Sequence, residues 1–192
     1  LSASQSVNAG RVRLEGTYNL RTQQYDATAD VMAWTVAPTA DRPLAVQLDA
    51  MFNGTGSVKQ PHGTGSLRAT NISWKGSSAG DLAADVELDG DAANIRARAP
   101  DLNAQLTARV NVRTPYATTA DLRGDNIDLE KLIPRSSSPT PLTGRVTVTA
   151  HTDAPLAQWR DGSARAEVVA LEAAAGDLPI RLVQPAAVRF AD

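Results

Sequence analysis

The chain has 192 residues, enough for one large β domain or two small ones with a real core. Its formal net charge is -2 at pH 7, so it lacks the basic excess typical of nucleic-acid binding. It has no cysteine, which excludes disulfides and thiol catalysis but leaves the cellular compartment open.

Hydrophobic residues make up 42% of the chain, but aromatic residues only 4%. A two-layer sandwich usually needs large side chains to fill the space between its sheets. A single curved sheet with one apolar face tolerates small ones better. No run of residues approaches the length of a membrane-spanning helix. Because both ends lie within weak or strand-like patterns, we expect the chain to be a piece of a longer protein.

Strict alternation of apolar and polar residues begins at residues 10–20, where Val12 and Leu14 would face one side and Arg11 and Arg13 the other. A period of two over this length predicts a half-buried β-strand.

The pattern continues after a turn at residues 21–24. The next strand is expected to carry its apolar face as far as Ala33. A further strand follows at residues 44–52. Residues 53–65 are rich in glycine around a central proline, which predicts a loop or two very short strands joined by a turn.

The middle of the chain repeats the strand pattern at intervals of about ten residues. Strands are expected at residues 67–74, 82–88, 93–99 and 105–112, with a weaker one at 116–124 and turns at 76–80 and 90–91. No segment has helical periodicity over a helix-like length. The sequence therefore predicts an all-β fold, an elongated antiparallel meander curled into a groove with one apolar concave face.

Residues 63–88 resemble a second stretch that begins at Gly162. In this alignment the triplet that begins at Gly80 matches the triplet that begins at Gly176, and both are expected to form the turn between two strands. A unit of this kind, once repeated, indicates an extended array whose function lies in the surface that it builds. Chance similarity between alternating strands is the alternative.

One short helical turn is expected near residues 127–133, where Asn126 or Asp128 would cap it and Pro134 would end it. Residues 134–141 form the only clear linker. The predicted organisation is a groove segment at 1–133, the linker at 134–141 and a continuation of the groove at 142–192.

No set of residues predicts catalysis, a cofactor site or a metal site. His62 and His151 are the only histidines, and each is expected in an exposed loop without carboxylates at ligand spacing. The carboxylates around Gly90 lack the spacing of a calcium loop. Tryptophans at positions 34, 74 and 159 are isolated, which favours packing at sheet edges over a sugar-stacking platform. We therefore expect a protein that is not an enzyme.

The remaining candidate is the apolar face itself. Its expected lining is Val12, Leu14, Val31, Val46, Leu48, Leu67, Leu82, Val86, Leu88, Ile95, Leu106, Val110, Val112, Val146, Val148, Val168, Leu178, Ile180 and Leu182. In a single open sheet these residues would form a groove for acyl chains or for a partner strand. In two sheets that close on each other, they would simply be a core. The residue pattern alone leaves both alternatives open.

The stretches ADLRGDNIDLEKLIP, LTGRVTVTAHTDAPLAQWRDGSARAEVVAL and AAAGDLPIRLVQPAAVRF, together with the linker, resemble the TamB/AsmA-like superfamily of envelope proteins. The shared pattern is carried by Leu142, Gly144, Pro155, Gly162, Leu178, Pro179, Ile180, Leu182 and Pro185. It covers most of residues 63–192 and includes no catalytic motif.

The resemblance implies a periplasmic β-groove, anchored at the inner membrane by a segment outside this chain. The groove would conduct phospholipid between the two membranes, support the assembly of outer-membrane and secreted proteins, or both. Its implied partners are phospholipid acyl chains and an outer-membrane β-barrel assembly protein, the latter contacted through parts outside this chain. The alternative function is a closed β-sandwich on a cell-surface protein that binds a glycan or another ligand.

Overall fold

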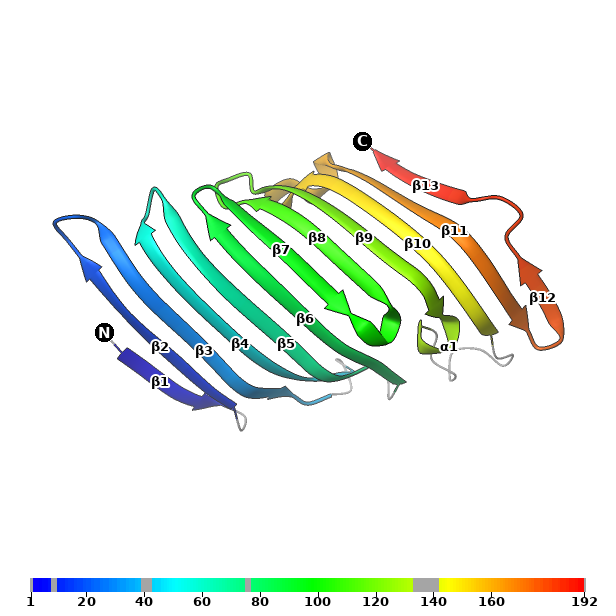
Figure 1. The fold of residues 1–192 in the computed structure, drawn as a ribbon, viewed down its shortest axis with the longest axis horizontal. Coiled ribbons are helices and arrows are strands. Elements are labelled where there is room, and N and C mark those ends of the chain that lie inside the picture. Colours follow the sequence, from blue (N-terminus) through cyan, green and yellow to red (C-terminus); the bar gives the residue numbers. More distant parts are fainter. Residues whose placement is uncertain (1, 8–9, 39–42, 75–76, 133–141, 192) are drawn as a thin grey trace.

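The computed structural model describes residues 2–7, 10–38, 43–74, 77–132 and 142–191. Twelve strands follow one another in an antiparallel meander, each paired with the next, and β13 also pairs with β11 (Figure 1). The strands are β1 (Ser2–Val7), β2 (Gly10–Asn19), β3 (Gln24–Val36), β4 (Leu44–Ser57), β5 (Pro61–Trp74), β6 (Ser77–Asp89), β7 (Ala92–Ala99), β8 (Ala104–Asn111), β9 (Ala117–Asp128), β10 (Leu142–Pro155), β11 (Ser163–Ala175), β12 (Leu178–Arg181) and β13 (Ala186–Ala191).

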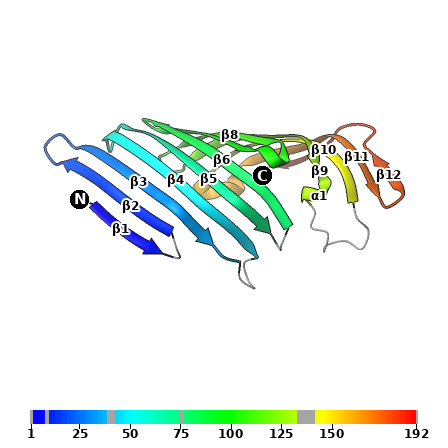
Figure 2. The same cartoon turned by 60° about the horizontal axis from the view of Figure 1, so that its bottom comes forward.

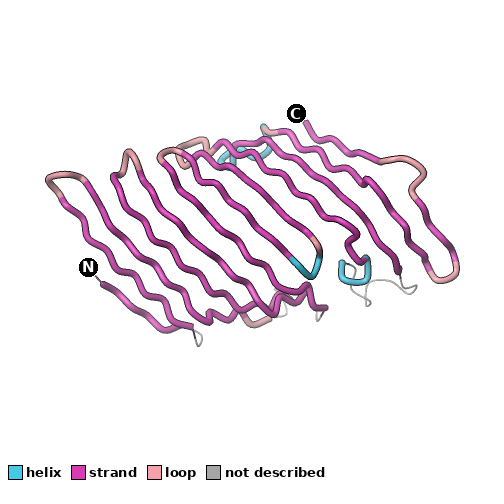
Figure 3. The backbone as a smooth tube through the Cα atoms, viewed as in Figure 1, coloured by secondary structure: helices cyan, strands magenta, loops and turns pink. Residues whose placement is uncertain are grey.

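Among the described residues, helical structure is confined to short pieces at the strand ends, as Figure 3 shows. These pieces are η1 (Pro100–Leu102), α1 (Leu129–Leu132) and η3 (Leu156–Asp161). The predicted all-β meander is confirmed, and so is the short helical turn. Asp128 caps α1, because its Oδ1 accepts a hydrogen bond of 3.0 Å from the amide of Glu130.

The sheet is one curved layer that does not close into a barrel (Figure 2). The surface area agrees with this openness. It is 13165 Å², whereas a compact monomer of 20.2 kDa would expose about 8,800 Å². The closed sandwich of the alternative interpretation is therefore wrong as a fold, since the described strands belong to one sheet.

The registers align the apolar residues of successive strands into rows across the sheet. One row crosses eleven strands, β2 to β11 and β13, and every member is aliphatic: Val12, Val31, Ala50, Leu67, Ala84, Ala97, Leu106, Leu122, Ala150, Ala166 and Val188. Paired residues in a sheet point to the same side. These side chains therefore share one face.

The opposite face is mainly polar in the same registers. A row one residue over contains Arg13, Asp30, Met51, Ser66, Asp85, Arg96, Thr107, Asp121, His151, Arg165 and Arg189. The two-residue period of the sequence thus places apolar side chains on one face and mainly polar side chains on the other over the whole width of the sheet.

A β-bulge in β3 changes the predicted facing of one residue. The register between β3 and β4 shifts between Val31 and Trp34, and Ala33 has a positive φ of 51°. The extra residue moves Trp34 onto the apolar face opposite Leu48, while Ala33 becomes exposed. The prediction that Ala33 continues the apolar face is therefore wrong.

The glycine-rich residues 53–65 form longer strands than expected. They make the end of β4, a turn at residues 58–60 and the start of β5. Phe52 explains why glycine suits this hairpin: a Cβ added to Gly54 or to Gly63 would lie 2.7 Å from the Phe52 ring. An aromatic ring lying over cross-strand glycines shields their backbone and stabilises the pairing.

The two Gly-Asp-Leu triplets occupy different places in the fold. Gly176 and Asp177 form the turn between β11 and β12, as expected. Gly80 instead lies inside β6, where it has a φ of 81° and pairs with Ile72 at a register shift. The prediction that both triplets form the turn is therefore wrong for the first copy. Both glycines have a positive φ, which favours glycine at each of the two positions.

The sheet continues across the predicted linker, although residues 133–141 themselves lie outside the described structure. Strand β9 pairs with β10 from Asp128 opposite Arg145 to Ala117 opposite Pro155. The segments on either side of the linker are thus neighbours in one sheet.

Candidate apolar groove

The apolar face is the concave side of the sheet. Figure 2 shows α1 beneath the hollow side. Leu129 of α1 packs with Ile127 and Val146 in the one cluster of buried residues among the described parts of the chain, and the three are 6–7% exposed. Val146 pairs with Ile127 and alternates with Val148 and Ala150 on the apolar side of β10. The hollow is therefore lined by apolar side chains.

The structure places most of the predicted lining residues on this face. Cross-strand pairing puts the following side chains there: Val12, Leu14, Val31, Val46, Leu48, Leu67, Leu82, Val86, Leu88, Ile95, Leu106, Val110, Val146, Val148, Val168, Leu178 and Ile180. Val112 lies one residue beyond β8 and is half-buried. Leu182 follows β12, and its amide donates a hydrogen bond of 3.0 Å to the Leu171 carbonyl.

Sequence reasoning missed part of the lining. Leu122 belongs to the apolar row, although its strand seemed weak by alternation. Ile127 was expected in the helical turn, and Leu171 is not among the predicted lining residues. Bulges in β9 and β11 break the two-residue period before each of them. Pairing with Val146 brings both onto the apolar face. In the sequence, the only sign that Ile127 and Leu171 belong to the lining is a one-residue shift in the alternation of apolar and polar residues.

Much of this face is open to solvent. Leu14, Leu122 and Phe190 are 51%, 40% and 52% exposed. Among the described residues, no large side chain is fully buried. The row of eleven strands spans about 48 Å, since neighbouring strands lie about 4.8 Å apart. This continuous apolar surface is larger than a soluble monomer normally leaves uncovered.

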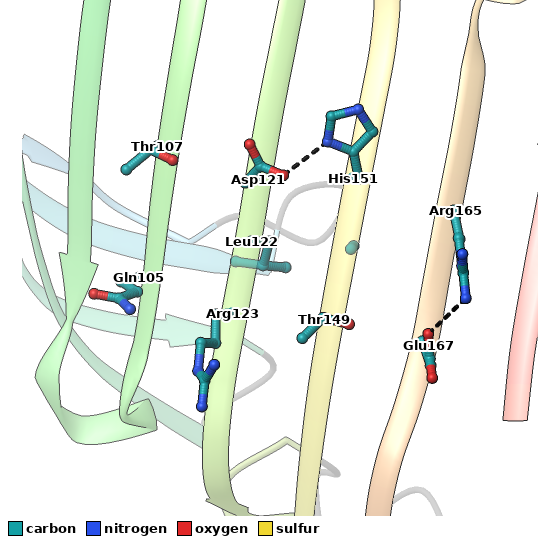
Figure 4. A pocket seen from close by; sticks show the side chains of 10 residues that line it. Gln105, Thr107, Asp121, Leu122, Arg123, Thr149, His151, Arg165 and Glu167 are labelled. Carbon is teal, nitrogen blue, oxygen red and sulfur yellow. Dashed lines mark hydrogen bonds and ion pairs between the residues drawn. The ribbon is translucent and has the colours of Figure 1, made fainter. Parts of the chain in front are cut away.

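The polar convex face also carries a depression, of about 530 Å³ (Figure 4). His151 Nδ1 lies 2.7 Å from Asp121 Oδ1, and Arg165 lies 2.9 Å from Glu167. The side chains of the histidine and its aspartate are 51% and 66% exposed. Such water-exposed pairs contribute little energy and are ordinary cross-strand contacts.

The histidines differ from their predicted setting. His62 lies in β5 and His151 in β10, so both are on strands and not in loops. Each faces a carboxylate on an adjacent strand, and His62 Nδ1 is 3.0 Å from Asp89 Oδ1. The described residues contain no group of three side chains suited to hold a metal ion.

Exposed ion pairs shift a few carboxylates on the convex side. Hydrogen bonding to Arg123 lowers the pKa of Asp125 below its ordinary value, and hydrogen bonding to Arg181 does the same for the pKa of Glu172. The side chains of Asp125 and Glu172 are 38% and 70% exposed. These shifts mark local pairing and do not indicate a catalytic group.

The tryptophans that can be placed lie near one end of the strands. Trp34 pairs with Leu48, and Trp74 pairs with Leu44, both on the apolar face. The Trp74 residue is 48% exposed. They lie on either side of β4, opposite residues that are four positions apart along it. The side chain of Trp159 lies outside the described structure. Trp34 and Trp74 thus belong to the rim of the apolar face.

The fold and its apolar face define an open, single-layer β-groove. Comparison with family models, curated proteins and solved structures returned no match. In the described part of the chain, no helix has the length and apolar character needed to cross a membrane.

Proposed function

We propose that this chain is a non-enzymatic segment of a lipid-conducting groove. Its concave face would hold the acyl chains of phospholipids while their headgroups stay in water. The observation that carries the proposal is the unbroken aliphatic row from Val12 to Val188 across eleven strands. The energetic reason is that covering an exposed apolar surface gains about 25 cal/mol for each Å² removed from water.

The resemblance to the TamB/AsmA-like superfamily supports a more specific proposal. On that basis the groove belongs to an envelope protein of the bacterial periplasm, anchored at the inner membrane by another segment. It conducts phospholipid between the inner and outer membranes, supports the assembly of outer-membrane and secreted proteins, or both. An open groove suits either cargo, because acyl chains and the apolar side of an unfolded strand both need cover from water.

Photocrosslinking tests the proposal directly. A photoreactive amino acid is placed at Val86, Val110 or Val148 on the concave face, and at Glu87 or Arg109 on the convex face as matched controls. The chain is then irradiated in the presence of phospholipid vesicles. We expect lipid adducts at the concave positions in clear excess over the controls. Equal capture on both faces would contradict a groove.

The glycan-binding alternative has one supporting feature, the polar depression around His151 on the convex face. It predicts that His151→Ala abolishes glycan binding and leaves lipid capture unchanged. The apolar row has no role in that alternative. We therefore favour the lipid groove.

A further inference from the structure

Two neighbouring hairpin tips at one rim of the groove share an unusual composition. The tip between β2 and β3 is residues 20–23, and the tip between β4 and β5 is residues 58–60. They lie side by side, because Gln24 pairs with Ser57 at the start of β3 and the end of β4. Each tip has one exposed aliphatic side chain followed directly by one cation, and neither contains a carboxylate.

The aliphatic side chains at these tips are almost fully in water. Leu20 is 85% exposed and Val58 is 77% exposed. The cations that follow them, Arg21 and Lys59, are exposed as well. One exposed aliphatic residue is unremarkable on a protein surface. The same aliphatic-cation pair on two adjacent tips forms a small patch with both apolar and basic character.

The turns are held by their own polar groups and do not need these side chains for packing. Asn19 Oδ1 accepts hydrogen bonds of 3.0 and 3.1 Å from the two amides that follow Leu20. In the second turn, the backbones of Ser57 and Gln60 bond reciprocally at 3.1 Å. The two tips therefore present Leu20 and Val58 on firm turns, which lowers the cost of burying them in a partner.

The carboxylates of the neighbouring tip are paired with other side chains and not with Arg21 or Lys59. The next tip along the rim is acidic, but its carboxylates are engaged: Asp91 lies 2.6 Å from Arg113, and Asp89 lies 3.0 Å from His62. Arg113 also donates a hydrogen bond of 3.1 Å to the Lys59 carbonyl, which ties the second tip to the Arg113–Asp91 pair.

Directly behind the tips, the apolar face begins with a pair of tyrosines. Tyr18 pairs with Tyr25 across β2 and β3, and Tyr18 is 50% exposed. Tyrosine suits the boundary between water and hydrocarbon, because its ring is apolar and its hydroxyl is polar. Aliphatic rows follow at once, with Leu14 and Val12 further along β2.

We propose that the paired tips, residues 20–23 and 58–60, dock the chain on the surface of an anionic phospholipid bilayer. Leu20 and Val58 enter the headgroup layer, and Arg21 and Lys59 contact lipid phosphates. Docked in this way, the tyrosine pair forms the threshold between the bilayer and the concave face. The use of that threshold for lipid transfer rests on the proposed function, whereas the docking itself does not.

Vesicle sedimentation tests the docking. The vesicles contain phosphatidylcholine either alone or mixed with about 30 mol% phosphatidylglycerol. The anionic lipid gives the vesicle a negative surface charge that attracts basic segments. The unmodified chain is expected to partition more strongly into the anionic vesicles, and added salt should weaken that preference. Arg21→Gln and Lys59→Gln should each lower the partition coefficient about fivefold, and the double variant about 25-fold.

Leu20→Ser combined with Val58→Ser should also reduce binding, including the residual binding to neutral vesicles. Val183→Ser is the matched control, since Val183 is 97% exposed and lies away from the tips, between β12 and β13. Circular dichroism verifies that each variant folds. Unchanged partition of the tip variants would overturn the proposal, and so would an equal loss with Val183→Ser.

A second readout separates this inference from the proposed function. Uptake of a soluble short-chain fluorescent lipid, measured without vesicles, reports on the groove alone. Normal uptake without vesicle docking would overturn the docking inference and leave the groove standing. Docking that depends on the tips, together with no uptake, would confirm the docking and contradict the groove.

Discussion

Gly144 provides the sharpest test of how the groove is built. It lies in β10 opposite Ala173 of β11, and its φ of +126° is a conformation that side-chain-bearing residues rarely adopt. A Cβ at this position would lie 2.5 Å from the Ala173 Cα and would overlap the Glu172 carbonyl oxygen. Both are backbone atoms, so neither can move without displacing β11.

The magnitude follows from two contributions. A strained backbone conformation costs about 1–3 kcal/mol. Moving β10 away from β11 loses ladder hydrogen bonds that are worth about 1 kcal/mol each. We therefore expect Gly144→Ala to lower the free energy of unfolding by about 3–5 kcal/mol, which is at the upper end for a single substitution.

Gly90→Ala is the matched control. Gly90 also has a positive φ, +58°, but nothing lies within 4 Å of an added Cβ. Only the conformational cost remains, about 1–2 kcal/mol. Urea unfolding followed by tryptophan fluorescence compares the two variants. With an m-value of about 3 kcal/mol/M, Gly144→Ala should lower the midpoint by about 1 M or more. A shift no larger than that of Gly90→Ala would refute the close approach of β10 and β11.

Three further predictions concern other parts of the sheet. Ile127→Ala should cost about 2–4 kcal/mol in urea unfolding, because Ile127 is 6% exposed within the one buried cluster that the described chain contains; a loss below about 1 kcal/mol would argue against that cluster. Phe52→Ala should cost about 1–2 kcal/mol and speed amide exchange at Gly54 and Gly63, which the ring covers; unchanged exchange would contradict this role. Arg181→Gln should raise the pKa of Glu172 toward its ordinary value in an NMR titration. Pairing with Arg181 lowers this pKa in the folded state, so the small stabilisation from the pair is present above the ordinary carboxyl pKa. That stabilisation is lost when the pH falls through the lowered pKa of Glu172.

The alternation of residues was sufficient to predict most of the strands and their two faces, although it missed β1 and the full length of β4 and β5. Side chains such as Val12, Val86 and Val148 follow the period of two, which local sequence determines. The strand that contains Leu122 was judged weak because its apolar positions hold alanine and threonine beside this one leucine. Pairing with β8 and β10 is what holds it in the sheet.

The remaining errors come from single residues that break the period. Ala33 and Gly80 have positive φ values of 51° and 81°, and each lies at a register shift. A bulge of this kind depends on the neighbouring strand as much as on its own residues. The contact of His151 with Asp121 could not be predicted either, because the two lie 30 residues apart and only the sheet brings them together.

The two faces of the sheet offer methyl groups of similar exposure, which makes one comparison especially direct. Leu14 and Leu122 on the concave face are 51% and 40% exposed, and Met51 on the convex face is 49% exposed. A spin-labelled fatty acid is added to the methyl-labelled chain, and signal broadening is recorded by NMR. If the concave face binds acyl chains, the Leu14 and Leu122 methyls broaden and the Met51 methyl does not. Equal broadening of all three, or broadening at Met51 alone, would contradict the groove.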